Sequence, residues 1–183
     1  MANLAEDEEV RLRARHIKAA LSTRHLDRGY KTATPSALEA HAMRQATRLN
    51  LVFRNRPSWA INARFAIAGP KKIHLPHDFH SRAQQSRAAL LMHELVHVRQ
   101  WRDHGTIKMG GRYAFDPRWR AAYEIAAYRE SMRAHIAMGW TQAQALRGRV
   151  QYLAMLVRDY GLGMLDTDQL IKVAFAAWEV PDV

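Results

Sequence analysis

The segment "ALLMHELVHVRQW", residues 89–101, constrains the fold of this chain more than any other stretch. Leu91, Leu95 and Val98 recur at helical spacing and predict a helix with one buried stripe. His93 and His97 lie one turn apart on another face, so both imidazoles can reach a single ion about 2 Å from each ring nitrogen. The segment therefore predicts a packed helix that offers two metal ligands.

Two histidines do not complete a catalytic zinc site, which usually has three protein ligands and a water. Asp103 and His104 follow on the same helix. A straight helix carries both about 9 to 10 Å beyond His97, too far to bind the same ion. They are weak candidates for the third ligand.

A carboxylate on the next long helix is the better candidate. Glu124 can reach the ion if its helix packs against the motif helix, and the small Ala127 at i+3 permits a close approach. Glu130 is the alternative, but it lies about 240° around the helix from Glu124, so the two cannot both face the site. We expect His93, His97 and Glu124 to hold one Zn²⁺ ion.

Outside this segment the apolar spacing changes between helical and extended, and predicts an α+β fold in which helices predominate. Three short strands are expected between residues 51 and 75, the last two joined by a turn at Gly69-Pro70. The motif helix should end near His104, where Gly105 follows. The other expected helices are at about 4–22, 34–50, 118–138, 141–160 and 166–178.

Capping residues set the expected helix starts. Ser36 and Glu39 are placed to form a capping box, and Ser81 to cap the motif helix. Asp116 followed by a proline predicts the start of the long helix that carries Glu124. Residues 105–115, "GTIKMGGRYAF", predict an irregular connection that can flex at its two adjacent glycines.

The length of 183 residues suits a single domain, 1–183. Cysteine is absent, which excludes disulfides and thiolate metal sites. The amino terminus opens acidic and has no apolar core of a secretory signal, and no apolar run approaches a membrane span. We therefore expect a cytoplasmic protein without a membrane partner. The sequence does not indicate an oligomeric state.

The formal net charge of +11 leaves a second function open. Such a balance favours contact with nucleic acid, although no basic run is dense enough to be a nucleic-acid-binding tail. The alternative is thus a basic nucleic-acid-binding protein with a structural metal site, which would usually need a fourth protein ligand. A protease acting on DNA-bound proteins and an inactive binding domain are further alternatives. The histidine-rich "HLPHDFH", residues 74–80, lacks helical register and favours a solvated loop over a second metal site.

With its HExxH helix and later glutamate, the chain resembles the gluzincin type of zincin metallopeptidase. It is similar to small zincin-like domains that read "HELVHVRQ", then an aromatic-containing stretch, then a "YExxAY" helix. Here these elements are residues 93–100, 111–115 and 123–128. The resemblance covers about 60–135 and implies a zincin-like core at about 51–139. The flanking helices expected in 1–50 and 140–183 carry no such resemblance.

The resemblance also implies a place for the substrate. In that family an extended peptide adds to the exposed edge of the strand that precedes the motif helix. The corresponding edge strand here is Lys72, Ile73, His74 and Leu75, and the implied partner is a peptide or protein substrate.

The residue types imply a hydrolytic mechanism. A zinc ion lowers the pKa of a bound water and polarises the scissile carbonyl. Glu94, beside the first ligand, would act as general base and pass the proton to the leaving amine. The oxyanion then needs a hydrogen-bond donor, for which the candidates are Tyr113, Tyr128 and His74.

Overall fold

The computed structural model describes part of the chain. Two expected helices, 4–22 and 166–178, lie outside the described residues, and within the expected helix 141–160 the described positions 144, 147–148 and 151–152 are helical. None of the described helices has the length and apolarity needed to span a membrane. The described residues are 32–60, 63, 65–141, 144, 147–148 and 151–152.

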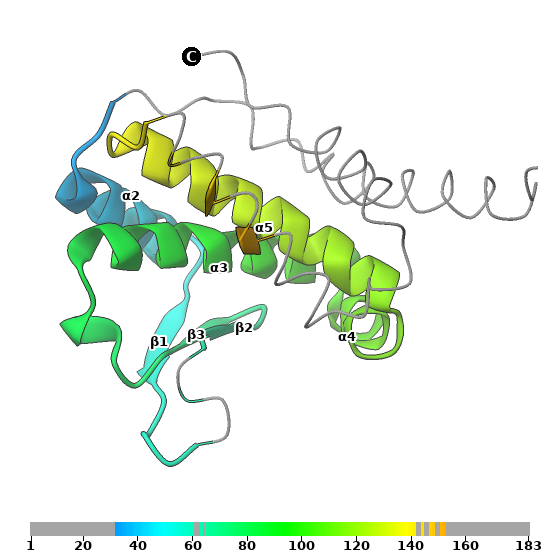
Figure 1. Ribbon diagram of the computed structural model, residues 1–183. Coiled ribbons are helices and arrows are strands. Elements are labelled where there is room, and N and C mark those ends of the chain that lie inside the picture. Colours follow the sequence, from blue (N-terminus) through cyan, green and yellow to red (C-terminus); the bar gives the residue numbers. More distant parts are fainter. Residues whose placement is uncertain are drawn as a thin grey trace, which may run out of the picture.

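The described part is a mostly helical α+β structure, as the sequence predicts (Figure 1). It consists of four helices and a small three-stranded sheet, and a 3₁₀ turn, η1, precedes the motif helix. The helices are α2 (Pro35–Arg48), α3 (Gln84–His104), α4 (Thr106–Phe115) and α5 (Pro117–Ala137), the strands are β1 (Val52–Asn55), β2 (Ile67–Ala68) and β3 (Lys72–Leu75), and η1 is Phe79–Ser81.

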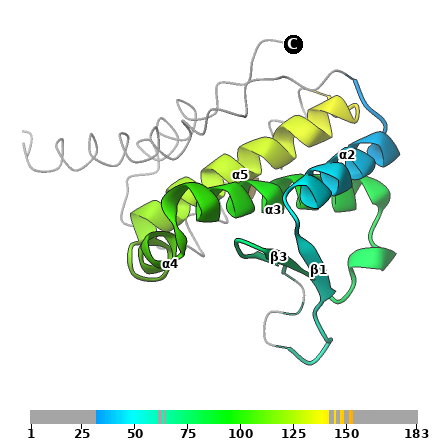
Figure 2. The ribbon, with the colours of Figure 1, turned by 180° about the vertical axis from the view of Figure 1, so that it is seen from behind.

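The motif helix α3 lies at the centre of this arrangement. It packs against α2, α4, α5 and β2, and is buried at eleven positions between Ala88 and Gln100. Figures 1 and 2 show α5 along one side of α3 and the sheet along another. The expectation of one buried stripe is therefore too narrow, because neighbouring elements cover several faces of α3.

Strand β3 is the middle strand of the sheet, which has the order β1-β3-β2. It pairs in parallel with β1 and antiparallel with β2, and the predicted turn at Gly69-Pro70 joins β2 to β3. Lys72–Leu75 is thus not an edge strand, and that prediction is wrong. Both sides of β3 are already hydrogen-bonded, so an added peptide strand cannot pair with it.

The structure corrects two predicted caps. Helix α2 is capped by Thr34, whose side chain accepts a hydrogen bond from the Ala37 N–H at 3.2 Å, with a proline at the first helical position. The carboxylate of Glu39 instead pairs with Arg87. Ser81 ends the 3₁₀ turn, and α3 begins three residues later.

Residues 106–115 form helix α4, so the prediction of an irregular connection is wrong. Met109, only 1% exposed, packs with Tyr123 of α5, and Tyr113 one turn later is partly buried against the same cluster. This packing outweighs the low helix propensity of the two glycines, which cost about 1 kcal/mol each. Helix α5 begins at Pro117 as predicted, and ends two residues before Gly139, which has a positive φ of 97°.

Candidate metal centre

Three buried side chains from two helices converge on one point. His93 and His97 come from α3, and Glu124 comes from α5; they are 8%, 7% and 3% exposed. The two Nε2 atoms are 3.1 Å apart, and they lie 3.5 Å and 3.4 Å from the two carboxylate oxygens of Glu124. Ligands about 2.05 Å from a tetrahedral ion are about 3.3 Å apart, so each of these distances matches the spacing between two ligands of one zinc ion.

The close packing of α3 on α5 brings Glu124 to the histidines. Val96, one residue before the second histidine, packs against Ala126 and Ala127, and these three side chains are almost completely buried. Small residues at this contact let the two helix backbones approach, which is the role expected for Ala127. The packing of the helices therefore positions the third candidate ligand.

A glutamine fixes the orientation of one imidazole. The Nδ1–H of His97 donates to the Oε1 of Gln100 at 2.8 Å, and the Nε2 of Gln100 donates to the backbone carbonyl of Tyr123 at 3.1 Å. In the neutral ring this keeps the proton of His97 on Nδ1 and leaves Nε2 as the atom that can bind a metal. Gln100 is fully buried and was missed as a site residue, although its i+3 position relative to His97 is visible in the sequence.

Tyr113 contacts the ligand carboxylate. Its hydroxyl donates to the Oε1 of Glu124 at 2.5 Å, and its ring lies edge-on to that of His97, with the centroids 6.4 Å apart. Tyr113 thus does come to the site, but from helix α4 rather than from a flexible connection. In this structure it holds Glu124 in place.

Glu94 is the remaining acid of the centre and is 4% exposed. Burial raises its pKa, an effect that the nearby His93 and His97 and a hydrogen bond from the Ala68 N–H only partly oppose. Its Oε2 finds no hydrogen-bond partner among the described residues. A buried carboxylate oxygen without a protein donor, beside a set of three ligands, fits a base that receives a proton from a small molecule held there.

The charges of the ligands support one another. Burial opposes the charge on His97, but the adjacent Glu124 carboxylate outweighs it and raises the pKa of His97 to about 9. Burial likewise opposes the charge on Glu124, yet His97 and His93 hold the pKa of this carboxyl well below its usual range. The metal-free centre is therefore a buried ion pair between His97 and Glu124.

The centre opens into a cavity of about 910 Å³. One wall is β2 with the two residues before it, Phe65 and Ala66, so β2 is the sheet edge that faces the site. Tyr128 forms another wall, its ring 4.7 Å from that of His93 and stacked on Tyr152. The cavity thus offers a strand edge and aromatic surfaces next to the candidate ligands.

The structure does not bring the other predicted candidates to the centre. His74 lies on the central strand β3 and is absent from the cavity lining, so it is not placed to stabilise an oxyanion there. Glu130 is buried near Arg133 of its own helix, outside the ligand group. Asp103 is exposed, and the ring of His104 packs on aromatic side chains of α5.

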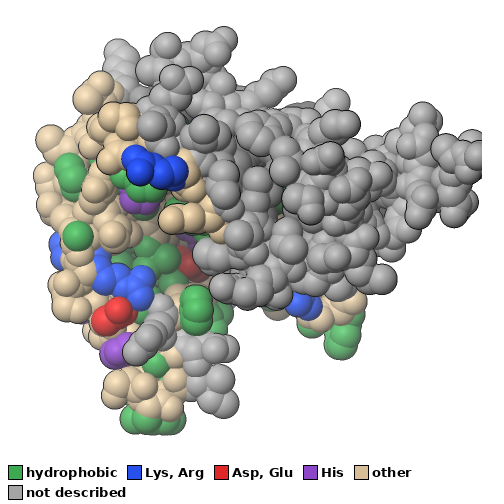
Figure 3. All heavy atoms as spheres, viewed as in Figure 1, with side chains coloured by type: hydrophobic (Ala, Val, Ile, Leu, Met, Phe, Trp, Pro, Cys, Tyr) green, Lys and Arg blue, Asp and Glu red, His purple; other side chains and the backbone are tan. Residues whose placement is uncertain are grey.

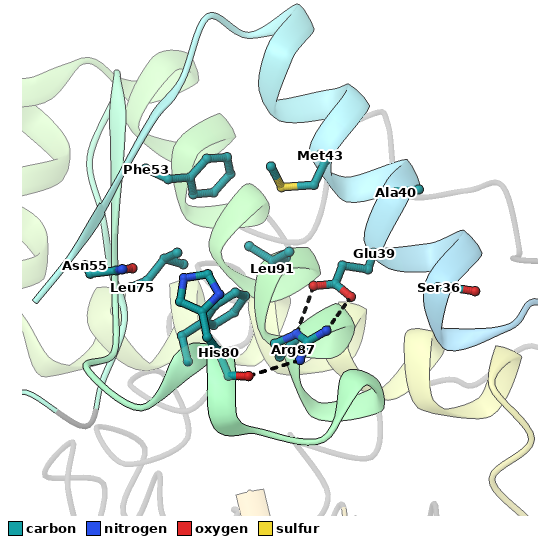
Figure 4. A pocket seen from close by; sticks show the side chains of 11 residues that line it. Ser36, Glu39, Ala40, Met43, Phe53, Asn55, Leu75, His80, Arg87 and Leu91 are labelled. Carbon is teal, nitrogen blue, oxygen red and sulfur yellow. Dashed lines mark hydrogen bonds and ion pairs between the residues drawn. The ribbon is translucent and has the colours of Figure 1, made fainter.

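The histidine-rich loop after β3 forms no second ligand group among the described residues. His77 contacts the Ala63 carbonyl, and Asp78 pairs with Arg82. His80 borders a second cavity of about 800 Å³ between α2, β1 and α3 (Figure 4). The charged groups drawn there, Glu39 and Arg87, are paired with each other at 3.0 Å.

Comparisons with protein-family models, with curated proteins and with solved structures found no match. The resemblance to gluzincins therefore rests on the sequence motifs alone and stays a hypothesis. The convergence of His93, His97 and Glu124 is an observation independent of that resemblance.

Proposed function

We propose that the protein is a zinc-dependent metallopeptidase. The observation that carries this proposal is the convergence of His93, His97 and Glu124, whose nearest ligand atoms are 3.1 to 3.5 Å apart, beside the buried Glu94. Three ligands are the usual protein set of a catalytic zinc, whereas a structural zinc takes four. No fourth ligand joins this group among the residues that the structure describes.

The chain's own residues supply the remaining parts of a hydrolytic site. When bound, Zn²⁺ would supply a Lewis acid and lower the pKa of a water. Glu94 accepts the proton of the attacking water at its carboxylate and returns it to the leaving amine. Tyr113 holds the Glu124 carboxylate, and Gln100 holds the ring of His97.

The substrate class follows from the wall of the cavity. Strand β2 pairs on one side with β3 and lines the cavity. The Ala68 N–H already donates to Glu94, and the Ala68 carbonyl accepts from Trp101. An extended peptide would therefore pair ahead of β2, along Phe65 and Ala66, which also line the cavity.

Tyr128 and Tyr113 flank the ligands, beside His93 and His97 respectively. The hydroxyl of Tyr113 already donates to Glu124, so Tyr128 is the better candidate for stabilising the oxyanion. The absence of cysteine agrees with action in the cytoplasm.

The test is peptide hydrolysis by zinc-loaded protein, with a peptide library as substrate, comparing wild type with Glu94→Gln. The substitution keeps the shape of the side chain and removes the base, so activity should fall by about 10² to 10⁴ while the zinc content stays the same. The matched control is Glu39→Gln, which changes a glutamate paired with Arg87 away from the centre and should keep its activity. Undiminished activity in Glu94→Gln would contradict the proposed base.

A further inference from the structure

The part of the chain that forms the sheet carries positive charge without acidic neighbours in sequence. Between Glu39 and Asp78 the sequence contains no acidic residue but seven basic ones. The two bounding acids are engaged elsewhere: Glu39 pairs with Arg87 at 3.0 Å, and Asp78 with Arg82 at 2.8 Å. The seven basic residues are Arg44, Arg48, Arg54, Arg56, Arg64, Lys71 and Lys72.

The strand register places two of these cations on one face of the sheet. Alternate residues of a strand point to opposite faces, and paired residues of adjacent strands point to the same face. Ile73 and Leu75 of β3 are 0% and 5% exposed and belong to the core that includes α3. The opposite side, here named the outer sheet face, carries Val52, Arg54, Ile67, Lys72 and His74.

The described helices leave the outer sheet face open. Figures 1 and 2 show α2, α3 and α5 on the other side of the sheet. Arg54 and Lys72 are exposed, as is Lys71 beside them, and Val52 and Ile67 are 53% and 49% exposed. In the view of Figure 3 the described surface likewise shows more Lys and Arg than acidic side chains.

The electrostatic environment of His74 reflects this arrangement. Partial burial, and then the charges of Lys72, Arg56 and Arg54, lower the pKa of His74. Three cations therefore lie near the imidazole of His74: Lys72 on β3, Arg54 on β1 and Arg56 directly after β1. This concentration of charge would attract a polyanion and raise its rate of encounter.

Two exposed aromatic residues lie between β1 and β2 in the sequence. Trp59, four residues after the end of β1, is 85% exposed, and Phe65, two residues before β2, is 61% exposed. Base–aromatic stacking beside a basic surface is the usual means of binding single-stranded nucleic acid. The apolar residues Val52 and Ile67 are interspersed with cations, so this face lacks the continuous apolar side that a membrane-inserted surface requires.

We propose that the outer sheet face binds single-stranded nucleic acid. Arg54, Lys71 and Lys72 contact the phosphates, and Trp59 and Phe65 offer stacking surfaces for the bases. Phe65 also lines the cavity of the metal centre, so a strand bound here passes its rim. This binding is separate from peptide hydrolysis and does not depend on the metallopeptidase proposal.

The test measures fluorescence anisotropy of a labelled oligothymidylate of about 16 nucleotides with the full chain over a range of salt concentrations. The double substitution Arg54→Glu with Lys72→Glu is compared with Lys108→Glu with Arg147→Glu, which makes the same change in net charge at exposed positions elsewhere. The first pair should weaken binding by about tenfold or more and lower the slope of log K against log salt by about 1.4. The second pair should leave the slope within error of wild type.

A further variant separates stacking from charge. Trp59→Ala keeps every cation, and its exposed side chain can be removed with little effect on the fold. It should weaken oligonucleotide binding by about fivefold or more and leave the salt slope unchanged.

Three results would overturn the proposal. The first is no binding by wild type at about 50 mM salt, where contacts to phosphates are strong. The second is an equal weakening of oligonucleotide binding by the two charge-reversal pairs, which would show that binding depends only on the net charge of the protein. The third is tighter binding of vesicles of phosphatidylcholine and phosphatidylserine than of the oligonucleotide, which would assign the face to a membrane surface. Circular dichroism of each variant confirms that the compared proteins are folded.

Discussion

The Oε1 atom of Gln100 lies 2.8 Å from the Nδ1 atom of His97, on the side of the ring opposite the candidate metal. The same amide group donates to the Tyr123 carbonyl, next to Glu124 on α5. Gln100 therefore connects two of the candidate ligands through one buried side chain. A ligand held in this way is already oriented toward the ion, and once Nε2 has lost its proton the neutral ring is in the correct tautomer.

Replacing Gln100 should therefore weaken metal binding. Gln100→Ala removes both hydrogen bonds of the amide and should lower zinc affinity by about 10- to 100-fold. Competition with a chromogenic chelator measures this affinity. Gln85→Ala, on the first turn of the same helix, serves as the control and should bind zinc like wild type. Equal affinity of a folded Gln100→Ala variant and wild type would show that the amide does not orient the ligand.

Tyr113 should act on the metal centre through Glu124. Tyr113→Phe keeps the ring beside His97 and removes the hydroxyl that donates to the carboxylate. Loss of a hydrogen bond to a charged group costs about 1.5 to 3 kcal/mol, so zinc affinity should fall by about tenfold or more. Tyr128→Phe keeps the ring that packs on His93 and should affect zinc affinity much less. If both variants bind zinc as wild type does, Tyr113 does not position Glu124.

Metal binding should release a proton from His97 at neutral pH. Because the metal-free His97 has a pKa raised to about 9, it is protonated at pH 7.5 and must lose its proton before Nε2 can bind an ion. Zinc affinity should therefore rise with pH until about pH 9. Calorimetric titrations at pH 7.5 in buffers of different ionisation enthalpy should show about one proton released by His97 per ion. A binding enthalpy that is the same in all buffers would contradict the buried ion pair.

The same ion pair should make the stability of the metal-free protein depend on pH. A folded-state pKa of about 9, above the ordinary 6.5, stabilises the fold fully below pH 6.5 and loses this effect as the pH rises through 9. In Glu124→Gln the partner charge is absent, so this contribution should disappear. Thermal melts in the presence of a chelator should show a difference in Tm between the two proteins that changes from pH 6.5 to 9.5. A constant difference would argue against the raised pKa.

The contact between α3 and α5 should be sensitive to side-chain size. Ala127 is fully buried against Val96, so Ala127→Leu forces the helices apart and should destabilise the protein by about 1 to 3 kcal/mol. It should also weaken zinc binding, because it moves Glu124 away from the histidines. Ala114→Leu, at an exposed position of α4, is the control for both urea unfolding and zinc affinity. If Ala127→Leu is destabilised but binds zinc as tightly as wild type, the contact between α3 and α5 does not position Glu124.

Local periodicity explains why the candidate ligands could be predicted from the sequence. An i, i+4 pair on a helix has a fixed separation, so His93 and His97 must lie on one face wherever that helix packs. Glu124 could be predicted because its helix has clear boundaries, with Pro117 at the start and Gly139 after the end. The overall class, mostly helical α+β, follows from the same local patterns.

Tertiary contacts explain what the sequence did not predict. Helix α4 is stabilised by the burial of Met109 against α5. A prediction from the low helix propensity of two adjacent glycines cannot take that tertiary contact into account. The strand order β1-β3-β2 is equally nonlocal: a strand that follows β2 in sequence inserts between β1 and β2. This order moves the edge that faces the cavity from Lys72–Leu75 to β2, and removes His74 from the centre.

The zinc content of purified, tag-free protein, measured by mass spectrometry, decides whether the centre binds a metal. Wild type is compared with Glu124→Ala and with the exposed control Asp103→Ala. The three-ligand centre predicts about one zinc ion per chain in wild type and in the control, and a sharply reduced content in Glu124→Ala. Wild-type protein without zinc, even after zinc addition and dialysis, would contradict the metal centre. Full zinc content in Glu124→Ala would show that another residue is the third ligand.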